Sequence, residues 1–287
     1  MEISITLPED FQECSVSSLL EKNWLVPKKV RHFLRIRKNV SVNGQPVPFH
    51  FPVKAGDQII LTFEGGDYST PKAQIGIAVP LDILFEDEHL IILNKPAGIK
   101  THPNEPDEQN TFLNQLAAYL EPKNQFPYVV HRLDTETSGC IVFAKNPFIL
   151  PILSRMLETK QISRHYQALV SGKIDKEKWT IRKNIGRHRH DRRKRVIDQQ
   201  KGALAVTHIE KAFYDSVARQ TAVFCSLETG RTHQIRVHLA SEGHPIINDP
   251  LYAPSTEGRL MLHAYELHLI HPFTNQEILV QANPGLW

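Results

Sequence analysis

Hydrophobic residues follow two different periods along this chain. Apolar positions three and four residues apart predict amphipathic helices over residues 111–120 and 151–160. Shorter apolar runs predict strands, at 83–85, 90–93, 166–170, 203–208 and 221–227. Because many strands occur with few helices and without regular strand–helix alternation, the pattern predicts an α+β fold. We expect a mixed, largely antiparallel sheet with flanking helices.

The N-terminal part shows a different pattern. Residues 15–63 predict two short helices, the second over 28–37, followed by a small set of strands. An Asn-Gly pair at 43–44 is a strong hairpin signal, and a Gly-Asp pair at 56–57 marks a later turn. This order resembles the S4 RNA-binding domain. The resemblance implies a small S4-like α/β domain over residues 1–64.

A stretch rich in Gly, Pro and small polar residues follows, over residues 65–80. Such composition is typical of a linker. We therefore expect residues 1–64 to dock on a ligand semi-independently of a catalytic domain that spans residues 81–287.

Positive charge is concentrated in two places. Between Lys22 and Lys38 there are seven Lys or Arg residues and no acid, and the spacing of four of them predicts one basic helix face. These four are Lys28, Arg31, Arg35 and Lys38. A solvated basic face is the alternative, but an unbroken positive face favours contact with RNA phosphates.

The second basic region spans residues 182–195, with eight Lys or Arg residues and a single acid, Asp191. It predicts an exposed loop or hairpin tip. A solubilising loop is the alternative. Since crowded like charges cost stability unless a polyanion is present, we favour contact with RNA backbone phosphates. The side chains singled out are Arg187, Arg189, Arg192 and Arg193.

Bulk composition narrows the class of protein. A length of 287 residues with 41% hydrophobic and 23% charged residues is typical of a globular protein with one large and one small domain. Three scattered cysteines suggest neither a disulfide framework nor a zinc site, which fits a reducing cytoplasm. We expect no signal peptide and no membrane span. Fifteen histidines are present without a metal-ligand spacing, so we expect no metal.

The segment His131–Gly139, HRLDTETSG, carries the first candidate chemistry. Alternate side chains of an extended backbone share a face, so Arg132 and Asp134 could point into one cleft while Leu133 anchors the loop. A carboxylate held this way is a candidate nucleophile or general base. The alternative is an Asp that caps a turn together with neighbouring hydroxyl residues.

A second cluster, GRTHQIRVHLA over residues 230–240, follows a predicted strand. Thr232 is a plausible N-cap and Gly243 a natural stop for a helix. Arg231 would then lie at the helix entrance, facing the sheet. A partly buried Arg needs an anion, which could be Asp134 or an RNA phosphate.

Together the two segments resemble the RluA-type family of pseudouridine synthases. The resemblance implies that Asp134 is catalytic and that Arg231 pairs with it. It also implies that Tyr166, in the run SRHYQALVSG, stacks on the target base. The match covers roughly residues 80–287. It departs from the family pattern at Asn248 and Ala253, positions that we expect to lie away from the catalytic set.

The resemblance implies an isomerase that converts uridine to pseudouridine in structured RNA. This isomerisation requires no redox cofactor and no metal. We expect Arg132 to replace the flipped base in its stack. Large-subunit ribosomal RNA is the expected substrate, with tRNA second, and no obligate protein partner is evident. The sequence leaves open whether Asp134 attacks the ribose, adds to the base or removes a ribose proton. The competing interpretations are a non-catalytic RNA-binding protein and a metal-dependent nuclease.

Overall fold

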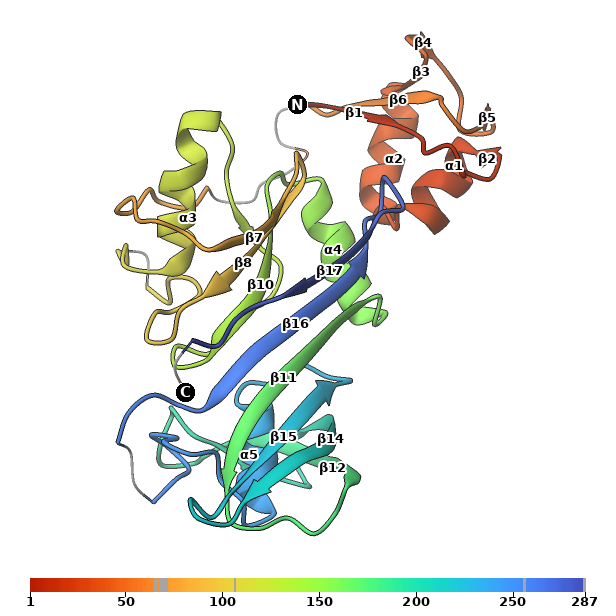
Figure 1. Cartoon of the computed structure of the whole chain (residues 1–287). Helices are drawn as coiled ribbons and strands as arrows, with labels where there is room; N and C mark the ends of the chain where they lie inside the picture. Colours follow the sequence, from red (N-terminus) through yellow and green to blue (C-terminus); the bar gives the residue numbers. More distant parts are fainter. Residues whose placement is uncertain (65–66, 68–71, 106, 255–256, 286–287) are drawn as a thin grey trace.

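The computed structural model describes residues 1–64, 67, 72–105, 107–254 and 257–285. It consists of a small N-terminal region at one end and a large sheet that runs the rest of its length (Figure 1). Both parts combine strands and helices, and nearly all strand pairs are antiparallel. The predicted α+β class and largely antiparallel sheet are therefore confirmed.

The N-terminal region is a four-stranded sheet in the order β1-β6-β3-β4, with helices on one side. Asn43 (φ 50°) and Gly44 (φ 79°) form the tight turn of the predicted hairpin. Helix α2 has the predicted bounds, and the Ser15 side chain caps the short first helix. The elements are β1 (Glu2–Thr6), β2 (Cys14–Ser15), α1 (Val16–Ser18), a π-helical turn (Leu19–Asn23), α2 (Lys28–Arg37), β3 (Val40–Val42), β4 (Gln45–Pro46), β5 (Pro52–Val53) and β6 (Gln58–Thr62).

The large sheet has the strand order β13-β12-β14-β15-β11-β16-β10-β8-β7, with β9 and β17 paired to β10 and β16. Its one described parallel pair joins β10 to β16. The strands are β7 (Ile83–Glu86), β8 (Leu90–Lys95), β9 (Tyr128–Val129), β10 (Ser138–Ala144), β11 (Ile162–Ser171), β12 (Lys178–Arg187), β13 (Arg195–Ile197), β14 (Ala203–Asp215), β15 (Gln220–Leu227), β16 (Leu262–Ile270) and β17 (Glu277–Gln281).

Strand β10 begins where it passes very close to β16. Gly139 has φ +116°, and a Cβ atom at this position would lie 2.2 Å from the carbonyl oxygen of Ala264. Only glycine tolerates both the dihedral angle and the approach. Beside it, the Ser138 hydroxyl and Nδ1 of His263 are 2.8 Å apart. These contacts fix the end of the segment that carries Asp134.

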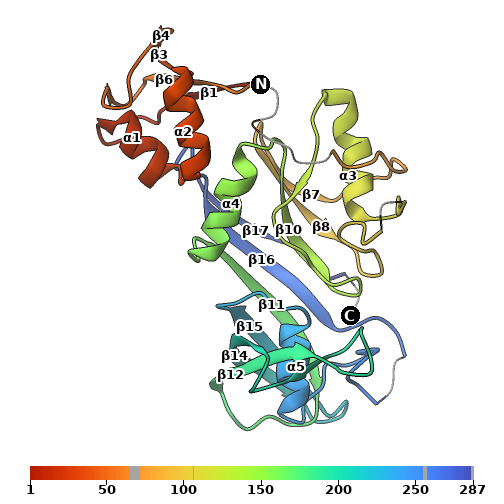
Figure 2. The same cartoon turned by 180° about the vertical axis from the view of Figure 1, so that it is seen from behind.

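Three helices pack on the large sheet: α3 (Phe112–Leu120), α4 (Ile149–Glu158) and α5 (Gln234–Ser241). Helices α3 and α4 match the two predicted amphipathic helices to within two residues. Helix α5 packs against β12, β13 and β14, on one face of that end of the sheet (Figure 2). It is held there by Gln234, whose amide donates to the Val206 carbonyl at 2.9 Å.

The N-terminal region shares one hydrophobic core with α4 and the neighbouring strands. Trp24 packs edge-on against Phe273 with ring centroids 5.2 Å apart, and Phe63 lies 5.2 Å from Phe148. All four rings are buried. We call this contact the seam. The expectation of a semi-independent N-terminal domain is wrong, because separating the two parts would expose these rings to water.

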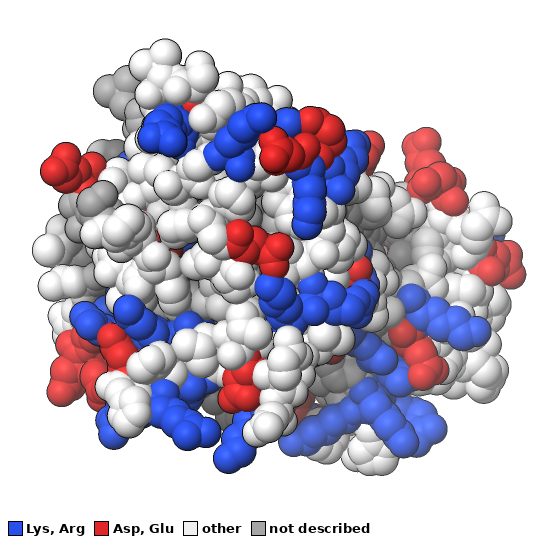
Figure 3. All heavy atoms as spheres, turned by 90° about the horizontal axis from the view of Figure 1, so that it is seen from below, with Lys and Arg blue, Asp and Glu red and all other residues white. Residues whose placement is uncertain are grey.

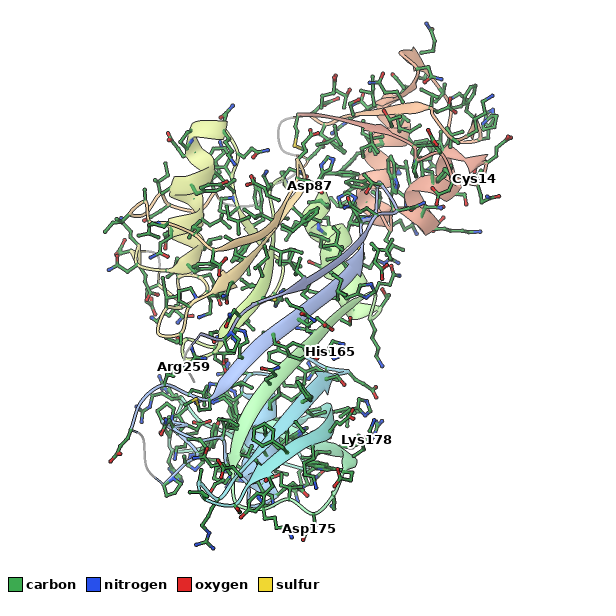
Figure 4. The ribbon with its side chains drawn as sticks, viewed as in Figure 1. Cys14, Asp87, His165, Asp175, Lys178 and Arg259 are labelled. Atoms are coloured by element: carbon green, nitrogen blue, oxygen red, sulfur yellow. The ribbon has the colours of Figure 1, made fainter. Side chains whose placement is uncertain are left out.

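Polar contacts border the seam. Asp87, at its edge in Figure 4, forms an ion pair of 3.1 Å with His271, and Asn275 donates to Asp10 at 3.4 Å. Of the predicted linker 65–80, residues 65, 66 and 68–71 lie outside the described residues. Its described end contacts the large sheet region, since Gly76 donates to the Asn114 carbonyl at 3.0 Å.

Candidate functional site

A cavity of about 220 Å³ lies where three segments converge. The loop 131–137 forms one wall, β11 a second, and residues 230–236 at the start of α5 the third. Arg132, Asp134 and Tyr166 all line it. The structure therefore brings together side chains that are separated by up to about a hundred residues in the sequence.

Hydrogen bonds from neighbouring segments fix the loop that carries Asp134. Leu133 is buried in the core, as the sequence predicted. Its backbone N–H donates to the Thr101 hydroxyl at 3.1 Å, and that hydroxyl donates to the Leu133 carbonyl at 2.8 Å. Gly98 donates to the Thr135 carbonyl at 2.8 Å. Asp134 is therefore presented on a rigid support.

Lys95 completes this support from a fully buried position. Its Nζ donates to the carbonyl oxygens of Pro96 and Ile99 at 2.8 Å and of Thr135 at 3.3 Å. Burial lowers the pKa of Lys95 to about 8, and the charges of Asp134 and Glu136 act in the opposite direction. Lys95 therefore ties two loops together as a cation beneath Asp134.

Arg236 is the cation that contacts Asp134. Its Nη1 lies 3.2 Å from Oδ2 of Asp134. Its other nitrogens, Nε and Nη2, donate to the two oxygens of Asp249 at 2.8 Å each. Both Arg236 and Asp249 are buried. Burial opposes the charge of Arg236, but the hydrogen-bonded Asp249 and the charge of Asp134 raise its pKa above the usual range.

The expectation that Arg231 pairs with Asp134 is wrong. Nε of Arg231 donates to the Leu204 carbonyl at 3.1 Å, at the exposed rim of the cavity. The physical reason is the geometry of the helix start. Helix α5 begins one residue later than predicted, with His233 rather than Thr232 at the N-cap (φ 58°). The inward-facing Arg of the first turn is therefore Arg236.

The two carboxylate oxygens of Asp134 have different surroundings. Oδ2 faces Arg236, and Nε2 of His233 lies 3.8 Å from it. Within the described part of the chain, Oδ1 receives no hydrogen bond. One oxygen is thus held by Arg236, while the other is left without a partner among the described residues, and Asp134 lines the cavity. This arrangement suits a carboxylate that must approach a ligand atom.

Two site residues were expected elsewhere. Asp249 and Tyr252 flank the departures from the family pattern, which we expected to lie away from the catalytic set, and the structure places them against Arg236 and His233. Asn248 has φ 59°, a left-handed conformation that Asn tolerates better than most residues. Asp249 could have been predicted from the sequence, because a buried Arg requires a buried acidic partner.

Tyr166 projects into the cavity from β11. The pairing of β11 with β16 shifts register between His165 and Gln167, so a bulge aims Tyr166 out of the regular ladder. The ring is 5% exposed. Burial raises the pKa of its hydroxyl, and nearby Arg164 acts in the opposite direction. The hydroxyl has no hydrogen-bond partner among the residues described.

The cavity carries an excess of positive charge. Of its described lining residues, four are arginines and one, Asp134, is acidic. Arg236 is already paired with Asp134 and Asp249, and Glu136 lies 4.0 Å from it. The other three are Arg132, Arg164 and Arg231, and no described acid lies within ion-pair distance of any of them. Unpaired arginines around a cavity attract an anionic ligand.

The two basic regions lie on the surface. On α2, Lys28 and Arg35 are exposed, as is Lys38 at its end, whereas Arg31 bonds to Glu21 at 2.8 Å and is mostly covered. The second region is the tip that joins β12 to β13. Viewed from the end of the molecule that carries these strands, Lys and Arg side chains form several clusters (Figure 3). The exposed arginines of the tip are Arg187, Arg189, Arg192 and Arg193.

Several histidines serve as buried hydrogen-bond partners. Nε2 of His131 accepts from the Val142 N–H at 3.2 Å, and His238 bonds to the Thr207 hydroxyl at 2.9 Å. No group of three or more His, Cys, Asp or Glu in the described residues is placed to hold a metal. No helix of the described chain is long and apolar enough to cross a membrane.

Known proteins match both parts of the chain. A family model described as RNA pseudouridylate synthase matches residues 89–241, and one described as RluD ribosomal pseudouridine synthase N-terminal domain matches residues 3–59. An uncharacterized RNA pseudouridine synthase of Bacillus subtilis, YhcT, is 39% identical over 98% of this chain and 93% of its own length. A Nitrosomonas europaea protein named ribosomal large subunit pseudouridine synthase D is 37% identical over 98% of this chain and 84% of its own.

A solved structure is also similar. Human RNA pseudouridylate synthase domain containing 1 superimposes with a TM-score of 0.60, at 25% identity, over 74% of this chain and 87% of its own.

Proposed function

The chain belongs to the RNA pseudouridylate synthase family, of the RluA type, and from this premise we propose that it isomerises specific uridines of large-subunit ribosomal RNA. Members of this family are isomerases that act on RNA. The names of the relatives and of the matched N-terminal family model support the ribosomal target. The proposal adds the target RNA and the residues that carry the reaction.

We propose Asp134 as the catalytic group. The observation that carries this assignment is its setting: Asp134 lines an arginine-rich cavity, and Arg236 bonds to its Oδ2, while no described residue bonds to Oδ1. In the reaction the N1–C1′ bond of uridine breaks, a C5–C1′ bond forms, and the proton of C5 leaves while N1 gains one. The net change consumes neither water nor an oxidant. A single well-placed carboxylate therefore suffices as nucleophile or base.

Other cavity residues take supporting roles in this proposal. Tyr166 stacks on the detached uracil and keeps it in place. Arg132, exposed at the rim, fills the space that the flipped base leaves in its stack. Arg231, without an acidic partner, contacts an RNA phosphate, which was the other anion considered for it.

The basic regions extend the contact with RNA. We assign residues 1–64 to an S4-like RNA-binding domain and residues 81–287 to the catalytic domain, joined through the seam. The exposed cations of α2 and of the β12–β13 tip contact backbone phosphates, which add affinity rather than sequence choice.

Tritium release from RNA labelled at C5 of uridine tests the proposal. Unmodified large-subunit ribosomal RNA and a tRNA pool are incubated separately with the protein, and the modified positions are then mapped. We expect release from ribosomal RNA, at one or a few sites. Release from tRNA alone would show that the target class is wrong.

Asp134→Asn supplies the matched control, because it keeps the size of the side chain and removes its charge. We expect the variant to fold and bind RNA but to lose at least about 10³-fold in single-turnover rate. Multiple turnover by a folded Asp134→Asn protein would remove Asp134 from the catalytic role. The reverse exchange of amide for acid at another position, Asn114→Asp, is not a suitable control. Asn114 is buried in α3, so a new charge there would disturb the fold.

A further inference from the structure

Two arginines from different segments meet at the mouth of the cavity. Strands β11 and β15 are antiparallel neighbours, with His165 opposite Ser226, so the start of β11 lies beside the segment that follows β15 (Figure 1). There the guanidinium of Arg164 packs on Gly230, where an added Cβ atom would lie 3.6 Å from Nη2 and 3.7 Å from Nη1. The next residue in the chain is Arg231. Both arginines line the cavity.

No acid of the described chain neutralises these two arginines. Nε of Arg231 donates to the Leu204 carbonyl, but no described residue bonds to its two Nη groups or to the guanidinium of Arg164. Glu228, the acid of the same segment, is instead paired with Lys160 at 2.8 Å. Unpaired cations on adjoining segments repel each other, and this repulsion is removed when an anion binds between them.

The depth of the two arginines indicates which anion binds there. Tyr166, two residues along β11 from Arg164, is 5% exposed, whereas Arg164 is half-buried and Arg231 is exposed. The arginines therefore lie nearer to solvent than the residue proposed to stack on the base. The anionic groups of an RNA chain are its phosphates, which avoid burial unless a cation accompanies them. A phosphate beside a nucleotide whose base lies at Tyr166 would reach the mouth of the cavity.

We propose that Arg164 and Arg231 form a clamp that binds one phosphate of the RNA backbone beside the target uridine. This inference rests on the proposed function and adds Arg164 to the residues that contact RNA. One arginine extends from β11 and the other from the segment after β15, so the two guanidinium groups can donate to the phosphate oxygens from different sides. The clamp would hold the strand while Asp134 acts on the nucleotide.

The detached uracil is the other place where negative charge develops near Arg164. When the N1–C1′ bond breaks, its electron pair can remain with the base. The charge of Arg164 reaches Tyr166: burial raises the pKa of the Tyr166 hydroxyl, and Arg164 acts against this effect. A phosphate contact exists before and during the reaction, whereas a contact with the detached base exists only during it. Binding and rate measurements therefore separate the two.

Equilibrium binding tests the clamp without requiring turnover. The probe is a short RNA carrying the mapped uridine, or unmodified large-subunit ribosomal RNA if no position is mapped. Arg164→Gln and Arg231→Gln should each weaken binding about 10-fold. Because both arginines serve one phosphate, the double variant should lower the slope of log affinity against log salt by about 0.7–0.9 in all. A loss about twice as large would assign them to separate phosphates, and an unchanged slope would remove both from RNA; either overturns the clamp.

A double-mutant cycle supplies the matched control. Losses from Arg164→Gln and Arg231→Gln should not add, since either change already breaks the shared contact. Arg164→Gln combined with Arg189→Gln, at the β12–β13 tip away from the cavity lining, should show additive losses. Additive losses in both cycles would contradict a shared phosphate. Arg164→Lys keeps the charge but loses the fork geometry, so it should recover the salt slope and only part of the affinity.

Single-turnover kinetics separate the phosphate from the uracil. For Arg164→Gln, we expect the half-saturating concentration to rise more than the saturated rate falls. A saturated rate that falls about 10-fold, with native affinity and salt slope, would place Arg164 at the detached base and overturn the clamp. Failure of the proposed function would appear as absence of turnover by the native protein. The binding measurements would then still decide whether the clamp exists.

Discussion

The seam and the cavity both join segments that are distant in the sequence, but they do so with opposite chemistry. The seam brings residues near 24 and 63 against residues near 148 and 273 through buried aromatic rings. In the cavity, the buried Arg236 forms ion pairs with both Asp134 and the buried Asp249. Apolar packing tolerates changes of detail, whereas a buried ion cluster depends on each member.

The difference shows where stability and chemistry reside in this molecule. The seam removes ring surface from water and needs no particular orientation of a proton or charge. In the cavity, one carboxylate oxygen of Asp134 is fixed by Arg236 and the other is not. This arrangement depends on the exact position of every neighbouring group. We expect damage to the seam to affect folding first, and damage to the cavity to affect the rate first.

The largest effect should come from removing one side of the seam. A chain beginning at Ile75 exposes Phe148 and Phe273, and each buried aromatic ring is worth about 1.5–3 kcal/mol. We expect loss of the cooperative unfolding transition in calorimetry, and recovery when residues 1–74 are added as a separate chain. Cooperative unfolding at the temperature of the full chain would mean that the seam contributes little.

Next in size is the loss of the buried cation in the cavity. Arg236→Met leaves Asp249 buried without a partner, and breaking such a pair costs about 3–5 kcal/mol. Arg231→Met changes an exposed residue and should cost less than about 0.5 kcal/mol. Urea unfolding of the two variants tests the corrected pairing directly. Equal costs would contradict the assignment of Arg236 as the partner of both acids.

Acid should destabilise the protein through His131, a buried histidine that lines the cavity. Burial lowers the pKa of His131 to about 3, against 6.5 in the unfolded chain. Between these values the unfolded state binds a proton that the native state lacks, so stability falls as pH decreases. One such proton corresponds to up to about 1.4 kcal/mol per pH unit. His131→Gln should flatten this dependence in unfolding experiments between pH 4 and 6, and an unchanged slope would assign it to other groups.

The smallest effect on the fold should come from the β12–β13 tip. Replacing Arg189 and Arg192 by Gln should leave both stability and saturated rate unchanged. It should lower the slope of log affinity against log salt by about 0.7–0.9 for each lost phosphate contact. Lys178→Gln, at the other end of β12, is the matched control. Equal salt slopes for both variants would argue against an RNA-contacting tip.

Local signals predicted most of the secondary structure. Apolar spacing predicted α3 and α4, and the Asn43-Gly44 pair predicted the hairpin of the N-terminal region. Leu133 was expected in the core because it alternates with two charged residues, and it lies there. Each of these inferences depends on residues that are neighbours in the sequence.

Long-range contacts were harder to predict. Nothing in the sequence near Trp24 indicates that its partner is Phe273, because apolar contacts carry no pairing signal. The choice between Arg231 and Arg236 depended on a shift of one residue at the helix start, with His233 in a left-handed conformation. Asp249 was missed for the same reason, since its role follows only from the direction of Arg236.

The position of β16 has a consequence for how the molecule is made. This strand lies between β11 and β10 in the sheet, and its residues near Ala264 fit against Gly139, five residues after Asp134. A ribosome adds about 5–20 residues per second, so on the order of ten seconds pass between synthesis of Asp134 and of its supporting strand. During that interval the nascent chain holds the whole HRLDTETSG segment without its neighbour. The segment that carries Asp134 therefore gains the neighbour that fixes its end only after the chain beyond Ala264 has been made.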